Sequence, residues 1–268
     1  MTQRLLMCSP EGFAINYEIN PWMTGQVGRV SVSVAAGQWQ FLRDQLASLA
    51  EIEVMPGDPA WPDLVFTANA GLPLPEAKTF VLASFRYPER QGETALSRRW
   101  FAARGWRCLE LGDGVHFEGA GDALLDSQGR LFVADGLRTD RAAAGRLAAH
   151  VGAEVHSLRL VDPDFYHLDT CFCPLARGYA LFLPAAFDAP SRDLLQRAFG
   201  ARLIALSAEE GRLFCANAVN IDDTIVMNEP TPRLAALLEK AGFRLLRTPL
   251  TEFMKSGGSA KCLTLRIA

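Results

Sequence analysis

Five polar or reactive residues recur along the chain at nearly equal intervals, each inside a short stretch of small and apolar residues. They are Asn69, Glu118, His167, Asn217 and Cys262, at intervals of 49, 49, 50 and 45 residues. Cysteine is a strong nucleophile once it is a thiolate, and histidine exchanges protons near neutral pH. A carboxylate can hold a cation or relay a proton. Brought together, the cysteine, histidine and glutamate predict nucleophilic catalysis.

The segments between these residues repeat as well. Each motif is followed by an apolar strand, then by a helix with apolar residues at three- and four-residue spacing that ends on glycine, then by another strand. The first strands are predicted at 79–85, 130–136, 179–187 and 224–230, the helices at 91–105, 140–152, 191–200 and 231–242, and the last strands at 106–111, 154–160, 202–207 and 243–250.

The two ends of the chain together supply a fifth unit. Residues 4–10, 35–50 and 51–56 read as strand, helix and strand, and the C-terminal segment around Cys262 provides the motif strand that they lack. We therefore predict an α/β fold, a five-bladed α/β propeller that forms a single domain over residues 1–268. Equivalent positions then converge on one axis. Residues 11–34 do not follow this repeat. They are predicted to form an inserted loop over one mouth of the ring of blades.

The composition excludes several classes of protein. The chain has 27 Lys+Arg against 30 Asp+Glu, a net charge of −3, and no basic run, so we expect neither nucleic acid nor a membrane surface as partner. It has no apolar run near the ~18 residues of a membrane span and no secretory leader, which favours the cytoplasm. A homo-oligomer is compatible with the sequence.

The sequence also gives no sign of a metal site or a cofactor. The six cysteines are scattered, so they are expected to be reduced, and Cys171 and Cys173 are interpreted as packed thiols rather than zinc ligands. The glycine-rich stretch at 118–123 lacks the lysine and the spacing of a phosphate-binding loop. By contrast, the small residues at 257–260 would let a substrate approach Cys262 closely.

Four motifs in this order resemble the guanidine-modifying superfamily, whose fold is the pentein. They are FTAN at 66–69, FEGAGD at 117–122, HLDT at 167–170 and GGSAKC at 257–262. The superfamily includes arginine deiminases, dimethylarginine dimethylaminohydrolases, amidinotransferases and bacterial arginine dihydrolases. The resemblance covers nearly the whole chain, and it implies a small-molecule guanidino substrate such as arginine.

The resemblance also implies a role for each site residue. Cys262 would attack the guanidinium carbon to form a covalent amidino-thioether, His167 would protonate the leaving ammonia and then activate water, and Glu118 would hold the guanidinium. Asp169 matches an aspartate that binds guanidinium nitrogens, since a guanidinium offers five donors in a planar fork. Arg90 and Arg138 resemble arginines that bind the α-carboxylate of the substrate, with Arg86 as a substitute.

This chain differs from some members of the superfamily at two positions, and these differences narrow the choice of reaction. Deiminases and dimethylarginine hydrolases carry aspartate where this chain has Asn69, and the latter usually carry lysine where Asp169 stands. The stretches NYEINPWM and FTANAGL resemble the arginine dihydrolases, in which two asparagines, here Asn20 and Asn69, serve an active site that gives ornithine, two ammonias and carbon dioxide. Asn20 also fits a plain turn residue before Pro21.

Several functions stay open at this point. Beside arginine dihydrolysis we consider deimination to citrulline, hydrolysis of methylated arginines and amidino transfer to an amine. A binding protein without enzymatic activity is a remote alternative, because such a protein would not need a cysteine and a histidine at converging positions.

Overall fold

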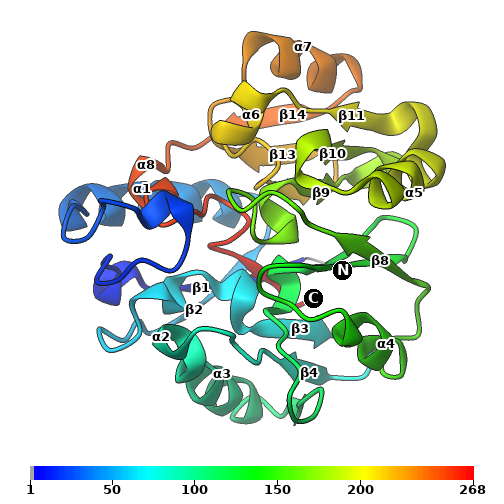
Figure 1. The fold of residues 1–268 in the computed structure, drawn as a ribbon. Helices are drawn as coiled ribbons and strands as arrows, with labels where there is room; N and C mark the ends of the chain where they lie inside the picture. The colour runs from blue at the N-terminus through cyan, green and yellow to red at the C-terminus, as the bar shows by residue number, and fades with distance from the viewer. Residues whose placement is uncertain (1–2) are drawn as a thin grey trace.

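Each predicted repeat forms one small sheet in the computed structural model, which describes residues 3–268 (Figure 1). In every sheet the first strand of the repeat runs antiparallel to the middle strand, which runs parallel to the last. The strands of the five sheets are β15 (Leu265–Arg266), β1 (Arg4–Cys8) and β2 (Glu51–Met55); β3 (Gly71–Leu74), β4 (Thr79–Leu82) and β5 (Arg107–Leu109); β6 (Ala123–Leu125), β7 (Leu131–Asp135) and β8 (Val155–Arg159); β9 (Phe172–Pro174), β10 (Ala180–Phe182) and β11 (Leu203–Ala205); and β12 (Val219–Ile221), β13 (Thr224–Met227) and β14 (Arg244–Arg247).

In each sheet a helix connects the middle and last strands, because parallel neighbours need a crossover connection. The α-helices are α1 (Val32–Ala47), α2 (Pro88–Gln91), α3 (Glu93–Ala102), α4 (Ala142–Ala148), α5 (Ala189–Phe199), α6 (Ala208–Arg212), α7 (Pro232–Lys240) and α8 (Thr251–Met254). The short helices α6 and α8 instead lie between the last strand of one sheet and the first strand of the next. Local signals set their starts: the side chains of Asp188 and Thr231 cap α5 and α7, and each of these helices has proline in its first turn.

The C-terminal strand completes the N-terminal sheet, as predicted. Strand β15 pairs antiparallel with β1, with Leu5 opposite Arg266 and Leu6 opposite Leu265. Cys262 lies three residues before β15. The position of the cysteine is therefore fixed by a strand that pairs with the other end of the chain.

The motif residues differ from the prediction in one respect, because they lie in turns before the first strands and not within strands. The 3-10 turns η4 (Thr67–Ala70), η5 (Gly119–Gly121) and η6 (Leu168–Thr170) stand where strands were expected. The small residues permit this tight path: Gly119 has φ +68°, a conformation that strands do not contain. The turns contact one another, since the Asn69 amide donates to the Glu118 carbonyl oxygen at 3.2 Å.

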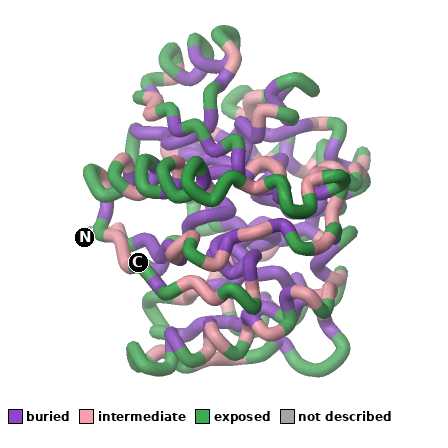
Figure 2. The backbone as a smooth tube through the Cα atoms, turned by 90° about the vertical axis from the view of Figure 1, so that its left-hand side faces the viewer, coloured by how far each residue is buried: buried purple, intermediate pink, exposed green. Residues whose placement is uncertain are grey.

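The interior consists mainly of the strands and turns, and the helices carry most of the exposed faces (Figure 2). Residues 9–31 lie between β1 and α1 and contain the 3-10 turns η1 (Pro10–Gly12) and η2 (Pro21–Met23), so the last three residues of the predicted 11–34 insertion belong to the helix. Helix α1 begins at Val32, a little earlier than predicted. Within residues 3–268, no helix combines the length and the apolar character that crossing a membrane requires.

Candidate active site

The turns and the 11–34 segment surround a narrow cavity. It holds about 10 Å³, enough for roughly one water molecule, so a larger ligand requires its walls to move. The walls contain six of the residues predicted from the sequence and seven others. The lining residues are Ile19, Asn20, Asp63, Phe66, Asn69, Arg90, Arg138, Tyr166, His167, Ser256, Gly257, Gly258 and Cys262.

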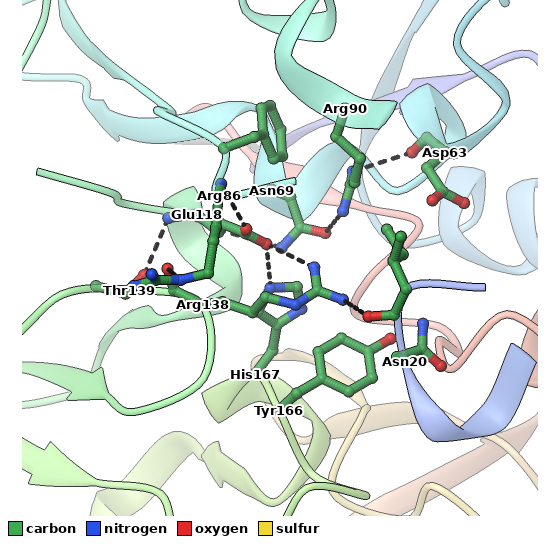
Figure 3. A network of polar contacts seen from close by, with 12 residues as sticks. Asn20, Asp63, Asn69, Arg86, Arg90, Glu118, Arg138, Thr139, Tyr166 and His167 are labelled. Carbon is green, nitrogen blue, oxygen red and sulfur yellow. Dashed lines mark hydrogen bonds and ion pairs between the residues drawn. The ribbon is translucent and has the colours of Figure 1, made fainter. Parts of the chain in front are cut away.

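Glu118 and Asp169, also predicted, lie just behind this lining. Glu118 is fully buried, and its Oε2 atom accepts hydrogen bonds from His167 Nε2 at 2.6 Å and from Arg138 Nη1 at 3.0 Å (Figure 3). Its other oxygen accepts from the backbone N–H of Arg86 at 3.3 Å. Every contact of this carboxylate is thus with a donor, and His167 and Arg138 present its charge to the cavity.

The protonation states of this pair follow from its surroundings. Burial alone would raise the pKa of Glu118, but Arg138 and the hydrogen bond from His167 outweigh burial and lower it. Burial lowers the pKa of His167 to about 4, against the opposing effect of Glu118. At neutral pH we therefore infer an ionised Glu118 and a neutral His167. The short contact assigns the imidazole proton to Nε2 and leaves Nδ1 able to accept one.

Arg138 has a guanidinium that lies directly over this carboxylate. Besides Glu118, it donates to the Ile19 carbonyl oxygen at 2.9 Å, and its central carbon lies 4.6 Å from the Tyr87 ring and 4.5 Å from the Tyr166 ring. Two aromatic faces and a carboxylate are favourable surroundings for a planar cation. Arg86, the alternative candidate for binding the substrate carboxylate, instead pairs with Asp140 at 2.5 Å.

Cys262 stands against a second carboxylate. Its Sγ atom lies 3.5 and 3.4 Å from the two oxygens of Asp169, and it accepts a hydrogen bond from the Asn217 side chain at 3.1 Å. Within the described part of the chain, no hydrogen bond joins this sulfur to His167, although both line the cavity. Cys262 and His167 thus belong to two separate polar groups.

Burial and the neighbouring charge keep this thiol protonated. Burial, followed by Asp169, raises the pKa of Cys262 well above its ordinary value of 9.0. Burial also raises the pKa of Asp169 to about 6, although Lys261 and the hydrogen bond with Cys262 oppose this. A cation brought into the cavity would favour the ionised form of both groups.

Arg90 is buried rather than exposed, which the sequence did not indicate. It donates to both oxygens of Glu93 at 2.8 Å, to the Asp63 carbonyl oxygen at 3.1 Å and to Asn69 Oδ1 at 3.0 Å. These bonds use four of its five N–H groups and leave one for a ligand. Arg90 also fixes the Asn69 amide, whose NH₂ group points to the Glu118 carbonyl oxygen.

Asn20 takes part in both the cavity wall and a turn. Its Oδ1 accepts from the backbone N–H groups of Trp22 and Met23, and its NH₂ group donates to the Ser256 carbonyl oxygen at 3.1 Å. The Tyr166 hydroxyl donates to the Gly257 carbonyl oxygen at 3.0 Å. Asn20 therefore ties the loop before Cys262 to the 11–34 segment, and Tyr166 ties the same loop to the turn that contains His167.

Glycine is required in this loop for two reasons. Gly257 has φ +85°, and a Cβ atom there would lie 2.4 Å from the Tyr166 hydroxyl. A side chain would push the loop away from the cavity. The small residues before Cys262 thus admit the neighbouring side chains as well as a ligand.

Sequence reasoning missed Asp63, Tyr166 and Ser256. Asp63 is buried, accepts a hydrogen bond from the Tyr17 hydroxyl at 3.0 Å and has its pKa raised by burial. Its signal was available, because it precedes a buried apolar run six residues before Asn69. Tyr166 and Ser256 have no comparable signal, since tyrosine and serine also occur in loops without any role.

Within residues 3–268, no group of three or more histidine, cysteine or carboxylate side chains is arranged to hold a metal ion.

Comparison with known proteins gives matches along the whole chain. The family model described as "N,N dimethylarginine dimethylhydrolase, eukaryotic" matches residues 37–268. The bifunctional arginine dihydrolase/ornithine cyclodeaminase AgrE of Nostoc sp. is 46% identical over 266 residues, which cover 98% of this chain and 38% of AgrE. The N(G),N(G)-dimethylarginine dimethylaminohydrolase of Mycobacterium tuberculosis is 36% identical over 268 residues, 99% of this chain and 86% of that enzyme.

Solved structures agree with these matches. The product-bound N-terminal domain of ArgZ, an arginine dihydrolase of cyanobacteria, has a TM-score of 0.98 at 43% identity and covers 100% of this chain and 98% of its own. A variant of the same domain, covalently bound to a reaction intermediate, has a TM-score of 0.97 at 43% identity, with coverage of 99% and 98%. The chain spans 37–38% of the length of the bifunctional cyanobacterial relatives.

Proposed function

Because this chain belongs to the family of N,N-dimethylarginine dimethylhydrolases, we propose that it is a cysteine-dependent hydrolase of a guanidino compound. The substrate we favour is free arginine, and the products are ornithine, two ammonias and carbon dioxide. One observation carries the proposal: a buried thiol with a carboxylate beside it shares a cavity with a histidine–glutamate pair. The cyanobacterial relatives named as arginine dihydrolases support the choice of substrate.

The place of the substrate guanidinium is suggested by Arg138. Its own guanidinium lies on Glu118 between two tyrosine rings, so these surroundings suit the reacting group of arginine. We propose that the substrate guanidinium takes this place, between Glu118 and Asp169. The displaced Arg138, together with the remaining N–H of Arg90, then pairs with the substrate carboxylate. Asp63 supplies a carboxylate for the substrate ammonium.

Proton transfer can be followed through the named atoms. The cationic substrate lowers the pKa of Cys262, and the thiol proton passes to Nδ1 of the neutral His167. The thiolate attacks the guanidinium carbon, and the C–N bond to one terminal nitrogen breaks as His167 returns the proton to that nitrogen. Ammonia leaves, and an amidino-thioether remains on Cys262. His167, neutral again, then takes a proton from the attacking water, while Glu118 stabilises the resulting imidazolium.

The number of ammonias depends on the fate of the next tetrahedral carbon. If sulfur leaves, one water is consumed and citrulline forms. If the second nitrogen leaves as ammonia, a thiocarbamate remains on Cys262. A further water then displaces the sulfur, and the N-carboxylated ornithine that is released loses carbon dioxide to give ornithine. We propose the second course because Asn69 is held by Arg90 and by the Glu118 carbonyl oxygen, beside the reacting group. Hydrolysis of methylated arginines is the second candidate, favoured by the Mycobacterium tuberculosis relative.

We also propose an architecture that goes with this function. The five sheets are the blades of an α/β propeller that forms one domain over residues 1–268. Residues 11–34 form the lid of its cavity. The turns before the first strands support the propeller because they contact one another, and Ile19 and Asn20 support the lid because they line the cavity.

The test is to count the ammonia released per arginine consumed and to identify the amino acid products by mass spectrometry. We expect two ammonias and ornithine, and Cys262→Ser should abolish turnover with little change in stability, since the volume change is small. One ammonia with citrulline would make the protein a deiminase. Arginine left unconsumed while dimethylarginine is hydrolysed would favour the second candidate. Normal turnover by Cys262→Ser would remove the cysteine from the mechanism.

A further inference from the structure

Asn217 holds the loop of the nucleophile through every hydrogen-bonding group of its side chain. The residue is fully buried and lies two residues before β12. Its Oδ1 accepts from the backbone N–H groups of Ser259 at 2.9 Å and Cys262 at 3.1 Å. Its NH₂ group donates to the Asp169 carbonyl oxygen at 2.9 Å and to Cys262 Sγ at 3.1 Å. Because two backbone donors face Oδ1, the amide cannot turn over without losing both bonds.

We propose that Asn217 is a catalytic residue that stabilises the thiolate of Cys262. The inference rests on the proposed function and deepens it. Among residues 3–268, Asn217 supplies the one side-chain N–H that points at the sulfur. A hydrogen bond donated to the charged form of a group favours that form. Asn217 would therefore bond the thiolate during attack and again when the thiolate leaves.

Two charged side chains act on the same sulfur. The Asp169 carboxylate, 3.4 Å away, opposes ionisation of the thiol, and burial opposes it more strongly. The neighbouring Lys261, whose Nζ atom lies 3.5 Å from the Ala120 carbonyl oxygen, favours ionisation. Asn217 differs from both because it acts at contact distance and carries no charge. Its effect does not depend on the protonation state of a neighbour.

The test measures the ionisation of Cys262 without arginine. The rate of alkylation by iodoacetamide is followed against pH, with the modified Cys262 peptide quantified by mass spectrometry. In Asn217→Ala the midpoint of this profile should rise by about one to two pKa units, the amount expected for one lost hydrogen bond to a charged group. Below the midpoint, alkylation should be about ten- to a hundredfold slower.

A second variant distinguishes the role of the Asn217 NH₂ donor from that of its Oδ1 acceptor. Asn217→Asp keeps an acceptor for the backbone N–H groups but replaces the donor by an oxygen, so its midpoint should rise at least as far as that of Asn217→Ala. The matched control is Asn228→Ala, another buried asparagine, whose NH₂ group donates to the Leu213 carbonyl oxygen at 3.0 Å and does not touch Cys262. The control should lower the melting temperature and leave the midpoint where it is.

The outcomes are distinct. A wild-type midpoint in either folded Asn217 variant would overturn the proposal, and so would an equal shift in Asn228→Ala. If arginine is turned over, kcat should fall at least tenfold in Asn217→Ala while KM changes little, because Asn217 contacts the sulfur and does not line the cavity. If arginine is not a substrate, the alkylation profile still decides the question, so failure of the proposed function and failure of this inference are told apart.

Discussion

The buried ion pair between Glu118 and Arg138 gives a prediction whose size can be worked out. Their nitrogen and oxygen atoms are 3.0 Å apart, and the side chains are 0% and 3% exposed. In Glu118→Gln, one carboxylate oxygen becomes an NH₂ group. That group must face either Arg138 Nη1 or the backbone N–H of Arg86, both of which are donors. Facing Arg86 costs one hydrogen bond, whereas facing Arg138 costs two, because His167 Nε2 donates to the same oxygen. In both orientations Arg138 keeps a buried charge without a carboxylate partner.

We expect Glu118→Gln to lower the free energy of unfolding by about 3–5 kcal/mol, the usual cost of removing one partner of a buried pair. Removing both charges in Glu118→Gln/Arg138→Met should recover part of that loss, with a coupling energy of about 2–3 kcal/mol. Urea denaturation at neutral pH measures both quantities. At roughly 2–4 °C per kcal/mol, the single variant should also melt clearly earlier.

An exposed ion pair of the same length provides the control. Arg247 and Glu229 are also 3.0 Å apart, but their side chains are 52% and 63% exposed. Water already solvates both groups, so Glu229→Gln should change the free energy of unfolding by less than about 1 kcal/mol. If Glu118→Gln costs no more than this control, or if the coupling energy is near zero, the reasoning about the buried pair is wrong.

Two further predictions concern Asn69 and Asp169. In Asn69→Asp, a carboxylate oxygen would face the Glu118 carbonyl oxygen, 3.2 Å from the present amide nitrogen, and we expect products to shift towards citrulline; an unchanged two ammonias per arginine would exclude this role. The pKa of Asp169 is raised from 3.8 to about 6, so its ionisation costs the folded state stability as pH rises through this range. Asp169→Asn should therefore be inactive yet more stable than the wild type above pH ~6, by up to about 3 kcal/mol, with the difference vanishing below pH ~4. Equal unfolding curves at neutral pH would show that the Asp169 carboxylate is not destabilised.

Much of the fold could be predicted because the sequence repeats the same physical pattern five times. The predicted helix at 231–242, for example, is observed as Pro232–Lys240, where Thr231 caps its start and Gly242 follows its end. Pairing of the two ends of the chain followed from counting which elements each end lacked. What the repeat could not give was the conformation of the motifs themselves. Short runs of small residues fit a strand or a turn equally well, and the neighbouring turns decide between them.

The sequence indicated which residues lie near one another in the candidate site, but not which of them are hydrogen-bonded to one another. Equal spacing indicated that Glu118, His167 and Cys262 converge, and all three lie in or directly behind one cavity wall. Spacing does not indicate which donor meets which acceptor. That Glu118 bonds Arg138, or that Asp169 stands against Cys262, depends on side-chain geometry across different turns. Such contacts join segments that have no common period in the sequence.

The two polar groups of the site also suggest how a cationic substrate would activate Cys262. Glu118 is ionised and already paired, whereas burial raises the pKa values of both Cys262 and Asp169, and the Asp169 charge raises that of Cys262 further. A guanidinium entering the cavity would bring a cation close to both groups. It would favour the Asp169 carboxylate and the Cys262 thiolate together, with His167 ready to take the thiol proton. An electrophile without positive charge would not produce this change, so the buried thiol should react slowly with neutral oxidants and alkylating agents. On this argument, the charge of the substrate both selects the substrate and activates the cysteine.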